Sequence, residues 1–536
     1  MAGDPTVCRY TRVNPISPQG NGGYGLTTLM PPAALYGANG IRVAPDGRLW
    51  ICEGLASRIS ICDTQTGELT TAVPMDGRLR GGDDLDFDVA GIAYVTEFAR
   101  VVSVQADGSV KAIAEGFSHA NGITISPDGR LFVNEFRMDG RLFEIGLQPP
   151  HTVRVIAEGL DLGNACDMGP DGRLYMQNVL AGEVYAVDVE TGAKALVAEG
   201  LKRVSSVKFD PRGRLLCSEA DLGVVTAIDL ATGARETAAR MPHRTIDNLD
   251  FDAAGNLYVS NYSTGCILKV TSQSGPDGEI LVPPGLVAPS SLAPIGEDTL
   301  LVANFTTIVT VSLAGVFEEW APWGPLSGEE VVRAAAPIDA DTVLVLTGGG
   351  QLYRARRGEA IADVKAAYEA GDAARFVAEA GATALAVSGG TIFAAFQDGD
   401  IRRLGANGRL ESLARSPLER ITAFAVDGDT VVCADGEAGT IAVLGHGQSA
   451  VIEGFDRPSA LAILGGLLFV AEAGGRQIVR CDLRGGARQV VASDLAFGSP
   501  IPGGPANGLP CLLAWPDGSL LVGCDGDGSI RSLVRQ

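Results

Sequence analysis

The 536-residue sequence contains few of the groups on which many binding and catalytic sites are built. It has only four histidines, and its ten cysteines form no CxxC pair, which argues against a zinc site and a disulfide framework. We expect the cysteines to be free thiols that pack as small apolar side chains. No apolar run approaches the roughly 18 residues that a membrane helix needs, and the first residues lack a secretory-signal pattern. These absences predict a cytoplasmic protein with no membrane partner.

Positive charge and aromatic residues are also scarce. The chain carries 42 Lys and Arg against 64 Asp and Glu, a net charge of −22, which argues against nucleic acid as a partner. Glycine, with 70 residues, and proline, with 28, are abundant, and 46% of the residues are hydrophobic. This composition is typical of many short strands joined by tight turns. The length favours two domains, since one hydrophobic core rarely supports so long a chain.

A β-hairpin pattern recurs through the first half. At 120–136, two runs of alternating apolar residues flank the turn Pro127-Asp128-Gly129, in which proline presets φ and glycine permits a positive φ. Related hairpins lie at 39–53, 83–97, 164–178, 205–219 and 247–261. Their turn glycines are 38 to 44 residues apart, which is the length of a four-stranded propeller blade.

The second half repeats the pattern more faintly, at spacings of 37 to 52 residues. Twelve units result, so the sequence predicts an all-β fold of two tandem six-bladed β-propellers, residues 1–286 and 287–536. Residues 25–31 have the pattern of a fourth strand without its first three, so they close either the last blade or the first ring. Residues 360–380 have helix-forming composition and apolar spacing, which predicts a helix outside the propeller.

Polar residues occupy two fixed positions in the first six units. Eight residues before the turn glycine stand Asn39, Asp83, Asn121, Asn164, Ser205 and Asp247. Six residues after it stand Glu53, Glu97, Glu135, Asn178, Glu219 and Asn261. The two positions are partners across one hairpin, so both sets are predicted at the same end of the first propeller, around its central channel. The second half carries no such set.

Carboxylates crowded at a channel mouth need a cation or shifted pKa values to relieve their repulsion. Carboxylate and amide oxygens suit a hard divalent cation, and many converging ligands favour Ca²⁺ over Mg²⁺ or another divalent ion. We therefore predict a cation site at the mouth of the first propeller, next to a small-molecule site.

The phrases ANGITISPDGRLFVNE, ANGIRVAPDGRLWICE and DNLDFDAAGNLYVSN resemble blade signatures of the senescence-marker/gluconolactonase/luciferin-regenerating family and of its paraoxonase and strictosidine synthase-like relatives. The resemblance covers roughly residues 35–285. It implies a six-bladed propeller that holds a catalytic Ca²⁺ with a Glu, two Asn and an Asp, and that in many members opens lactones.

Two registers carry the family's ligands onto this chain. If Asn121 takes the family's Asn-Gly position, Asp83 lies one blade before it, Asn164 one blade after it, and Asp247 where the family has its Glu. If Asn39 takes that position, Asp83 falls on the family's Asp, Asp247 on the preceding Asn, and Asn164 on the Glu. Both registers give two carboxylates and two amides.

The resulting hypothesis is a Ca²⁺-dependent lactone or ester hydrolase. The cation would polarise a carbonyl while His119, His243, or one of Glu53, Glu97, Glu135 and Glu219 acts as general base on water; without metal, mutual repulsion would raise the pKa of the glutamates. One alternative is a lyase or isomerase that uses the same cation, as streptogramin-lyase propellers with related repeats do. Another is a non-catalytic binding propeller.

An apolar surround distinguishes a small-molecule enzyme from an interaction platform, because the reaction needs a dry pocket. Suitable side chains stand just outside the two polar sets: Tyr36, Phe98, Phe136, Leu180 and Tyr262. The second propeller is expected to serve packing, and it offers a surface for a homo-oligomer.

Overall fold

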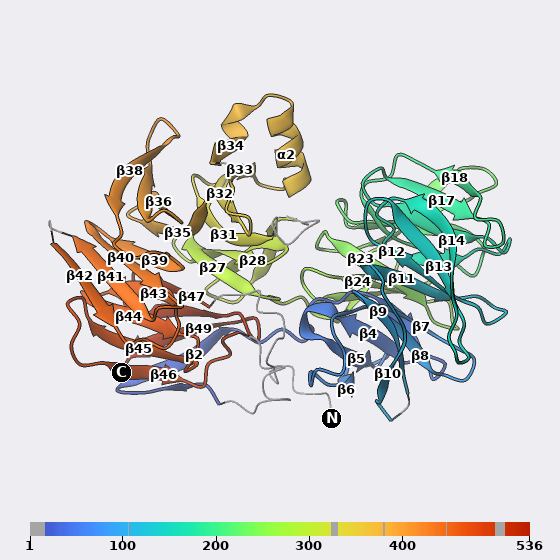
Figure 1. Cartoon of the computed structure of the whole chain (residues 1–536), viewed down its shortest axis with the longest axis horizontal. Helices are drawn as coiled ribbons and strands as arrows, with labels where there is room; N and C mark the ends of the chain where they lie inside the picture. The colour runs from blue at the N-terminus through green and yellow to red at the C-terminus, as the bar shows by residue number, and fades with distance from the viewer. Residues whose placement is uncertain (1–16, 106, 323–330, 379–380, 446–447, 499–509) are drawn as a thin grey trace. The chain divides into compact units, whose positions relative to one another are not determined.

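The chain folds almost entirely into β-strands (Figure 1). The computed structural model describes residues 17–105, 107–322, 331–378, 381–445, 448–498 and 510–536. These residues form twelve antiparallel sheets, eleven of four strands and one of five, an all-β architecture consistent with β-propellers. They divide into two compact units: unit 1 is residues 34–285, and unit 2 is residues 17–33 together with 286–536.

Unit 1 contains six sheets, each built from four strands that follow one another in sequence. Their strands are β3 (Ile41–Val43), β4 (Leu49–Glu53), β5 (Arg58–Cys62), β6 (Leu69–Val73); β7 (Gly82–Phe87), β8 (Ala93–Glu97), β9 (Arg100–Val104), β10 (Val110–Glu115); β11 (Ala120–Ile125), β12 (Leu131–Glu135), β13 (Gly140–Ile145), β14 (Val153–Leu160); β15 (Cys166–Met168), β16 (Leu174–Asn178), β17 (Glu183–Val187), β18 (Lys194–Ala198); β19 (Val204–Phe209), β20 (Leu215–Glu219), β21 (Val224–Ile228), β22 (Arg235–Arg240); β23 (Ile246–Phe251), β24 (Leu257–Asn261), β25 (Ile267–Val270) and β26 (Glu279–Val282).

Unit 2 also contains six sheets, two of which take a strand from the N-terminal residues. Its strands are β1 (Gln19–Gly20), β2 (Tyr24–Met30), β27 (Pro289–Pro294), β28 (Thr299–Asn304), β29 (Thr307–Ser312), β30 (Phe317–Ala321), β31 (Val332–Pro337), β32 (Thr342–Thr347), β33 (Leu352–Arg356), β34 (Phe376–Ala378), β35 (Ala382–Ser388), β36 (Thr391–Phe396), β37 (Asp400–Leu404), β38 (Leu410–Arg415), β39 (Ala423–Asp427), β40 (Thr430–Asp435), β41 (Thr440–Gly445), β42 (Gln448–Glu453), β43 (Pro458–Leu464), β44 (Leu467–Glu472), β45 (Gln477–Asp482), β46 (Gln489–Ser493), β47 (Cys511–Ala514), β48 (Leu520–Cys524) and β49 (Ser529–Arg535).

The turn at Gly129 illustrates why the repeated phrase folds into a hairpin. Ser126 accepts the Gly129 N–H through its carbonyl at 2.8 Å, and Gly129 adopts φ +85°. That conformation suits glycine because a positive φ is strained for residues that carry a Cβ, although the space around the turn is open. The flanking strands β11 and β12 pair from Ile125↔Leu131 outward.

The first strands of the six unit 1 sheets contact one another in a cycle. Each of β3, β7, β11, β15 and β19 contacts the next first strand, and β23 contacts β3. Two hydrogen bonds join the last sheet to the first: Ser260 Oγ donates to the Asn39 carbonyl at 2.8 Å, and the Val43 N–H donates to Asp250 Oδ2 at 2.7 Å.

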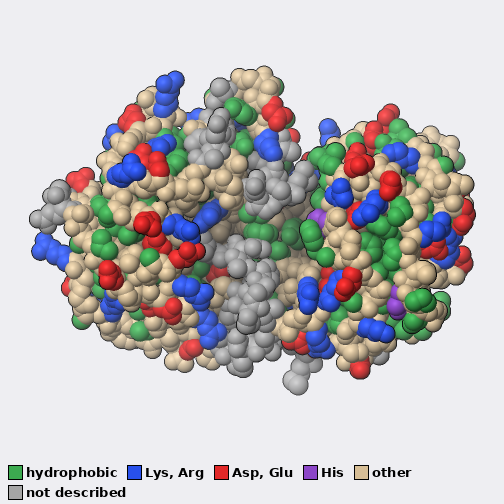
Figure 2. Space-filling view, viewed as in Figure 1, with side chains coloured by type: hydrophobic (Ala, Val, Ile, Leu, Met, Phe, Trp, Pro, Cys, Tyr) green, Lys and Arg blue, Asp and Glu red, His purple; other side chains and the backbone are tan. Residues whose placement is uncertain are grey.

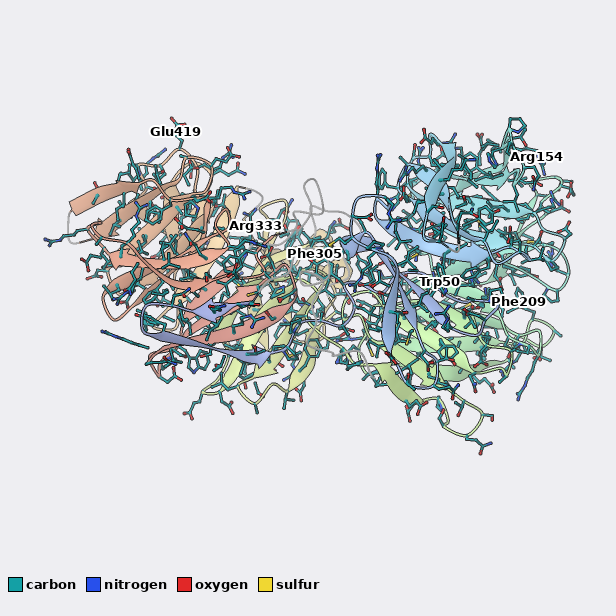
Figure 3. The ribbon with its side chains drawn as sticks, turned by 90° about the horizontal axis from the view of Figure 1, so that it is seen from below. Trp50, Arg154, Phe209, Phe305, Arg333 and Glu419 are labelled. Atoms are coloured by element: carbon teal, nitrogen blue, oxygen red, sulfur yellow. The ribbon has the colours of Figure 1, made fainter. Side chains whose placement is uncertain are left out.

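The core of each unit is divided among the spaces between neighbouring sheets. One apolar cluster in unit 1 joins Ile41 and Ile51 of the first sheet to Tyr258 and Ile267 of the last. Edge-to-face ring pairs add to this packing, Trp50 with Phe87 and Tyr175 with Phe209, and Figure 3 labels Trp50 and Phe209. A cluster in unit 2 likewise joins its first and last sheets.

The N-terminal strands belong to unit 2. Strand β2 pairs with β49 and completes the last sheet, where Figure 1 shows it in blue among red strands. Strand β1 adds a fifth strand to the preceding sheet by pairing with β46. Residues 25–31 were predicted to close either the last blade or the first ring, and in the structure they lie in the last sheet.

The helix predicted over residues 360–380 is correct only for its first half. Helix α2 covers Ile361–Glu369, and strand β34 pairs with β33 as the fourth strand of its sheet. Gly371, at φ +100°, separates the helix from the short 3-10 turn η2 (Ala373–Arg375) that leads into β34. Unit 1 has one such turn, η1 (Gly54–Ala56).

No helix among the described residues combines the length and apolar character needed to cross a membrane. The nine cysteines of the described segments are free and buried, as expected, and Cys8 lies outside those segments. On the face shown in Figure 2, acidic and basic side chains are interspersed, so the net charge is not gathered there into one patch.

Candidate functional site

The two predicted polar sets lie at the same end of the unit 1 sheets. Antiparallel pairing places Gly82 opposite Glu97, Val204 opposite Glu219, and Ile246 opposite Asn261. The start of each first strand therefore lies beside the end of its second strand. The turns that join second and third strands leave from this same end.

Four of the predicted metal ligands come together there, and we call them the carboxylate–amide cluster: Asn39, Asp83, Asn164 and Asp247. Asn164 Nδ2 donates to Asp247 Oδ1 at 3.1 Å and to the Ser205 carbonyl at 2.8 Å. A side-chain hydrogen bond joins Asn39 to Asp83. Each carboxylate thus has one amide beside it.

Asn121, the fifth predicted ligand, lies on β11 between the strands that carry Asp83 and Asn164. Its side chain is buried, and in the described structure it makes no hydrogen bond to the four cluster residues. Its carbonyl instead accepts a hydrogen bond from Thr96 Oγ1, which ties neighbouring sheets together.

The cluster keeps its two carboxylates in an unfavourable environment. Burial and the nearby charges of Asp247 and Asp84 raise the pKa of Asp83 well above its usual range. Burial likewise raises the pKa of Asp247 to about 7, although the hydrogen bond from Asn164 opposes the shift. The two carboxylates and burial also raise the pKa of the Tyr262 phenol. Without a counter-ion, the folded unit therefore holds protons at this site.

These shifts predict that the metal-free protein becomes less stable as the pH rises. The pKa of Asp247 is 3.8 unperturbed and about 7 in the folded unit, so the folded state binds the proton more tightly. Stability is then unaffected near pH 4 and declines as the pH rises through about 7. In EDTA, the melting temperature of unit 1 should be higher at pH 5 than at pH 8, and Asp247→Asn should reduce the difference. A melting temperature that rises with pH would contradict this assignment.

The glutamates of the second set have hydrogen-bond partners of their own. Glu53 accepts hydrogen bonds from Arg58, from Ser60 and from the Tyr36 N–H. Glu135 accepts a bidentate pair from Arg141 at 2.9 Å and the Ser118 N–H at 2.8 Å. Both side chains are fully buried. This arrangement fixes the loop before the first strand against the third strand.

The expectation of raised glutamate pKa values is wrong for Glu135. Burial alone would raise its pKa, but the hydrogen bonds and charge of Arg141 and the Ser118 N–H together lower it. The positive guanidinium of Arg141 stabilises the charged form of Glu135, whereas repulsion between the glutamates was expected to disfavour it. Neither Glu53 nor Glu135 hydrogen-bonds to the carboxylate–amide cluster in the described structure; their partners are arginines and loop N–H groups.

His119 and His243 both lie in loops that enter first strands at the cluster end. His119 stacks on Phe98, with centroids 4.6 Å apart, and meets Phe136 edge-on at 5.3 Å. Burial lowers the pKa of both imidazoles, which keeps them neutral near pH 7. His243 is buried, and its carbonyl accepts a hydrogen bond from Asn261.

The positive φ of His119, +85°, is a repeated feature of the backbone in unit 1. The residue two before the ring position has a positive φ in all six unit 1 sheets: Gly37, Gly81, His119, Leu162, Arg203 and Thr245. The conformation therefore serves the loop that enters each first strand, and carries no information about catalysis.

Sequence reasoning missed a second polar layer, farther along the first strands. Arg42 lies 3.4 Å from Asp86 and 3.7 Å from Asp250, and Lys208 lies 3.4 Å from both Asp167 and Asp250. We call these five side chains the buried ion-pair network. All stand five residues before a turn glycine, a position that alternates basic or neutral with acidic residues from sheet to sheet.

The acidic members of this network also join neighbouring sheets. Asp86 accepts the Ile125 N–H at 2.8 Å, and Asp167 accepts the Phe209 N–H at 2.9 Å. Burial raises the pKa of Asp167 to about 7, and that of Asp84, between the network and the cluster, to about 6. The interior of unit 1 is therefore acidic along the first strands, and only Arg42 and Lys208 offset it within the network.

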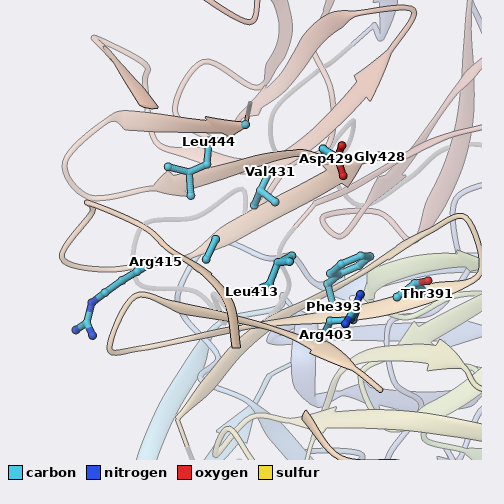
Figure 4. A pocket seen from close by; sticks show the side chains of 11 residues that line it. Thr391, Phe393, Arg403, Leu413, Arg415, Gly428, Asp429, Val431 and Leu444 are labelled. Atoms are coloured by element: carbon cyan, nitrogen blue, oxygen red, sulfur yellow. The ribbon is translucent and has the colours of Figure 1, made fainter. Parts of the chain in front are cut away.

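Unit 2 has a separate cavity of about 430 Å³, between the sheets of β35–β38 and β39–β42 (Figure 4). Phe393, Leu413 and Val431 line it together with Arg403 and Arg415. Arg403 pairs with Glu411 at 3.1 Å, and Arg415 donates to the Asp398 carbonyl. Because these guanidinium groups have partners elsewhere, the cavity offers no convergent set of polar groups comparable to that of unit 1.

Comparison with known proteins gives limited similarities. No family model matches the chain. A gluconolactonase of Zymomonas mobilis is 27% identical over 111 residues, 17% of this chain and 31% of the relative, so the match spans about a third of that protein. Among solved structures, virginiamycin B lyase from Staphylococcus aureus has 18% identity and a TM-score of 0.38, covering 55% of this chain and 98% of that one. A streptogramin B lyase has 14% identity and a TM-score of 0.38, covering 55% and 96%. The gluconolactonase match is thus a similarity of part of this chain to part of that protein.

Proposed function

We propose that each unit is a closed six-bladed β-propeller, so that the twelve sheets are the blades of two propellers. The cycle of first-strand contacts supports closure, as do the hydrogen bonds between the last and first sheets of unit 1. In such a ring the first strands surround the central axis, so the carboxylate–amide cluster stands at one mouth of the unit 1 channel.

For unit 1 we propose a Ca²⁺-dependent hydrolase that opens a lactone or ester at this mouth. The observation that carries the proposal is the pair Asp83 and Asp247, two buried carboxylates with raised pKa values that are each joined to an amide, the charge of Asp247 adding to the shift of Asp83. Such a pair is unfavourable by itself, and a divalent cation would relieve it.

The residues present fit a calcium ion. Asn39 Oδ1 is buried and has no hydrogen-bond partner in the described structure, so an amide oxygen is left for a ligand. Asn164 uses its Nδ2 for Asp247 and Ser205, which leaves its Oδ1 to ligate. No three His, Cys, Asp or Glu side chains form a metal site in the described segments; the candidate set mixes carboxylates with amides, as calcium sites do.

When bound, the cation would polarise the substrate carbonyl and stabilise the oxyanion. The chain's own residues supply the rest of the reaction. His119 is neutral near pH 7 and is held between Phe98 and Phe136, so it is placed to accept a proton from water. His243 is the second candidate base, from the loop before β23. Asn39 and Asn164 orient the carboxylates.

The test is an assay of lactone and ester hydrolysis with and without Ca²⁺. We expect turnover of at least one lactone that is lost in EDTA and restored by added Ca²⁺ but not by Zn²⁺. Elimination instead of hydrolysis, seen as an unsaturated product without uptake of water, would move the site to the lyase class. Turnover that is indifferent to EDTA would contradict the role of the cation.

We infer a cytoplasmic setting from the nine free, buried cysteines, because oxidising compartments favour disulfides. For unit 2 we propose a packing or self-association role. On β31 of unit 2, Arg333 stands at the position that carries a cluster carboxylate or amide in unit 1, and Figure 3 labels it. Burial lowers the pKa of its guanidinium.

A further inference from the structure

Four large apolar side chains of unit 1 are exposed in the equivalent turns of four consecutive sheets. Phe98, Met138, Leu180 and Leu222 lie in the turns between second and third strands and are 62%, 61%, 53% and 51% exposed. We call these four side chains the apolar rim. Exposed apolar side chains scattered singly are ordinary, but a repeated set at one end of a unit indicates a binding surface.

The apolar rim lies at the same end as the carboxylate–amide cluster. Phe98 directly follows Glu97, which pairs with Gly82 at the start of β7, next to Asp83. Met138 and Leu222 stand in the corresponding turns after Glu135 and Glu219. The two remaining turns carry Leu55 and Tyr262, both half-buried, so each of the six turns contains a large apolar or aromatic residue.

Unit 2 has no such rim among its described residues. Its turns between second and third strands are 305–306, 348–351, 397–399, 436–439, 473–476 and 525–528, and none exposes a large apolar side chain. Phe305, labelled in Figure 3, is buried. The apolar rim therefore accompanies the carboxylate–amide cluster and is not a general property of these turns.

One member of the rim touches a candidate catalytic residue. The Phe98 ring stacks on His119 with an interplanar angle of 28° and a centroid separation of 4.6 Å. An apolar group that covers Phe98 thus lies against the imidazole. This contact connects the apolar rim to a candidate base of the proposed reaction.

Building on the proposed function, we propose that the apolar rim binds the alkyl or aryl part of a lactone or ester whose carbonyl lies at the carboxylate–amide cluster. The preferred substrates are then lactones with a large apolar substituent rather than sugar lactones. In the reaction, the water oxygen bonds to the carbonyl carbon, the ring C–O bond breaks, and the leaving alkoxide takes the proton to give the hydroxy acid. A negatively charged lipid surface is a poor alternative for a chain of net charge −22.

The first experiment compares δ-decalactone with δ-valerolactone, which differ only in a pentyl chain. We expect kcat/KM to be at least about tenfold higher for δ-decalactone, because the chain buries apolar area on the rim. In the variant Met138→Ser/Leu180→Ser/Leu222→Ser this ratio should fall towards one, mainly through KM. Glucono-δ-lactone, which has no apolar substituent, should be a poorer substrate than δ-decalactone.

The matched control is Val89→Ser/Leu230→Ser. Val89 and Leu230 are exposed apolar residues in turns at the opposite end of the β7–β10 and β19–β22 sheets, so their loss should leave the ratio unchanged. A wild-type ratio near one, or an equal fall in the control variant, would overturn the assignment of the rim while leaving the hydrolase proposal intact.

A binding measurement separates the rim from the reaction. Calorimetry with the lactams of the same two frameworks, which are not hydrolysed, should show at least about tenfold tighter binding of the pentyl-substituted lactam, lost in the rim variant. If this preference holds but no lactone is hydrolysed, the rim stands and the proposed function fails. If both lactams bind equally, or if the rim variant only converts a dimer into a monomer, the rim has another occupant and the inference is wrong.

Discussion

Replacing both Asp83 and Asp247 with asparagine is expected to lower the rate of lactone hydrolysis by at least about 1,000-fold, the scale on which loss of oxyanion stabilisation acts. The two carboxylates carry the negative charge of the carboxylate–amide cluster, and amides in their place would leave no anionic ligand. The same variant should not lose stability in EDTA at pH 8, because it removes two carboxylates that burial and repulsion disfavour.

The combination of lost activity and retained or increased thermal stability distinguishes a functional site from a structural one. Asp107→Asn/Asp277→Asn is the matched control, since these exposed aspartates lie in turns of the same two sheets and give the same change in charge. We expect its activity to equal that of the wild type. A double variant of the cluster that unfolds at lower temperature and keeps its activity would show that Asp83 and Asp247 serve the fold.

Replacing Arg42 with methionine is expected to lower the free energy of unfolding of unit 1 by about 3–5 kcal/mol. The guanidinium donates to the carbonyl oxygens of Leu85 and Ile123 and lies between Asp86 and Asp250. Methionine fills a similar volume but leaves Asp86 without its cationic partner and Asp250 with Lys208 alone. Urea unfolding followed by hydrogen exchange of unit 1 peptides would measure the loss separately from unit 2.

Arg48→Met provides the control on the same hairpin. Arg48 pairs with Asp46 at 2.6 Å, but both side chains are about half exposed, so this pair should contribute less than about 1 kcal/mol. Equal effects of the two substitutions would mean that the buried ion-pair network does not stabilise the first strands. Lowering the pH to 5 should reduce the effect of Arg42→Met, because the abandoned carboxylates can then take up protons.

Much of the architecture could be predicted from the repeated hairpin. The turn at Pro-Asp-Gly is determined by these residues alone. The alternating runs beside it place their apolar side chains on one face of each strand. The strands and their repeat length can therefore be predicted directly from the sequence. Strand β34 was missed because Phe376–Ala378 follows helix α2 and has helix-forming neighbours. Its strand conformation depends on pairing with β33, a contact that no local pattern specifies.

The candidate site was predictable in position and less so in chemistry. Counting from the turn glycine placed Asp83 and Asp247 at one end of unit 1, and the structure brings each beside an amide. The same counting made Glu53 and Glu135 candidate general bases whose pKa values mutual repulsion would raise. Their partners Arg58 and Arg141 stand five and six residues farther on, across the next turn. Each glutamate also accepts a hydrogen bond from a loop N–H group 17 residues before it. A search for arginine after each glutamate would have found these pairs.

The buried ion-pair network shows a different limit. Arg42 and Lys208 belong to no predicted site, and a single repeat gives no reason to expect them buried, since buried basic residues are rare without partners. Asp250 lies within reach of Arg42 because the last sheet of unit 1 contacts the first. Contacts between sheets cannot be inferred from any single repeat, whereas their signature, acidic and non-acidic residues alternating at one position, is visible when the six repeats are aligned.

The most direct test of the account is calcium binding by the purified protein. We predict one Ca²⁺ per chain by metal analysis, a melting temperature that falls when EDTA removes it and recovers on adding Ca²⁺, and loss of both effects in Asp83→Asn/Asp247→Asn. A protein that holds no divalent cation, and that melts identically with EDTA and with Ca²⁺, would contradict the calcium site and the hydrolase proposed on it.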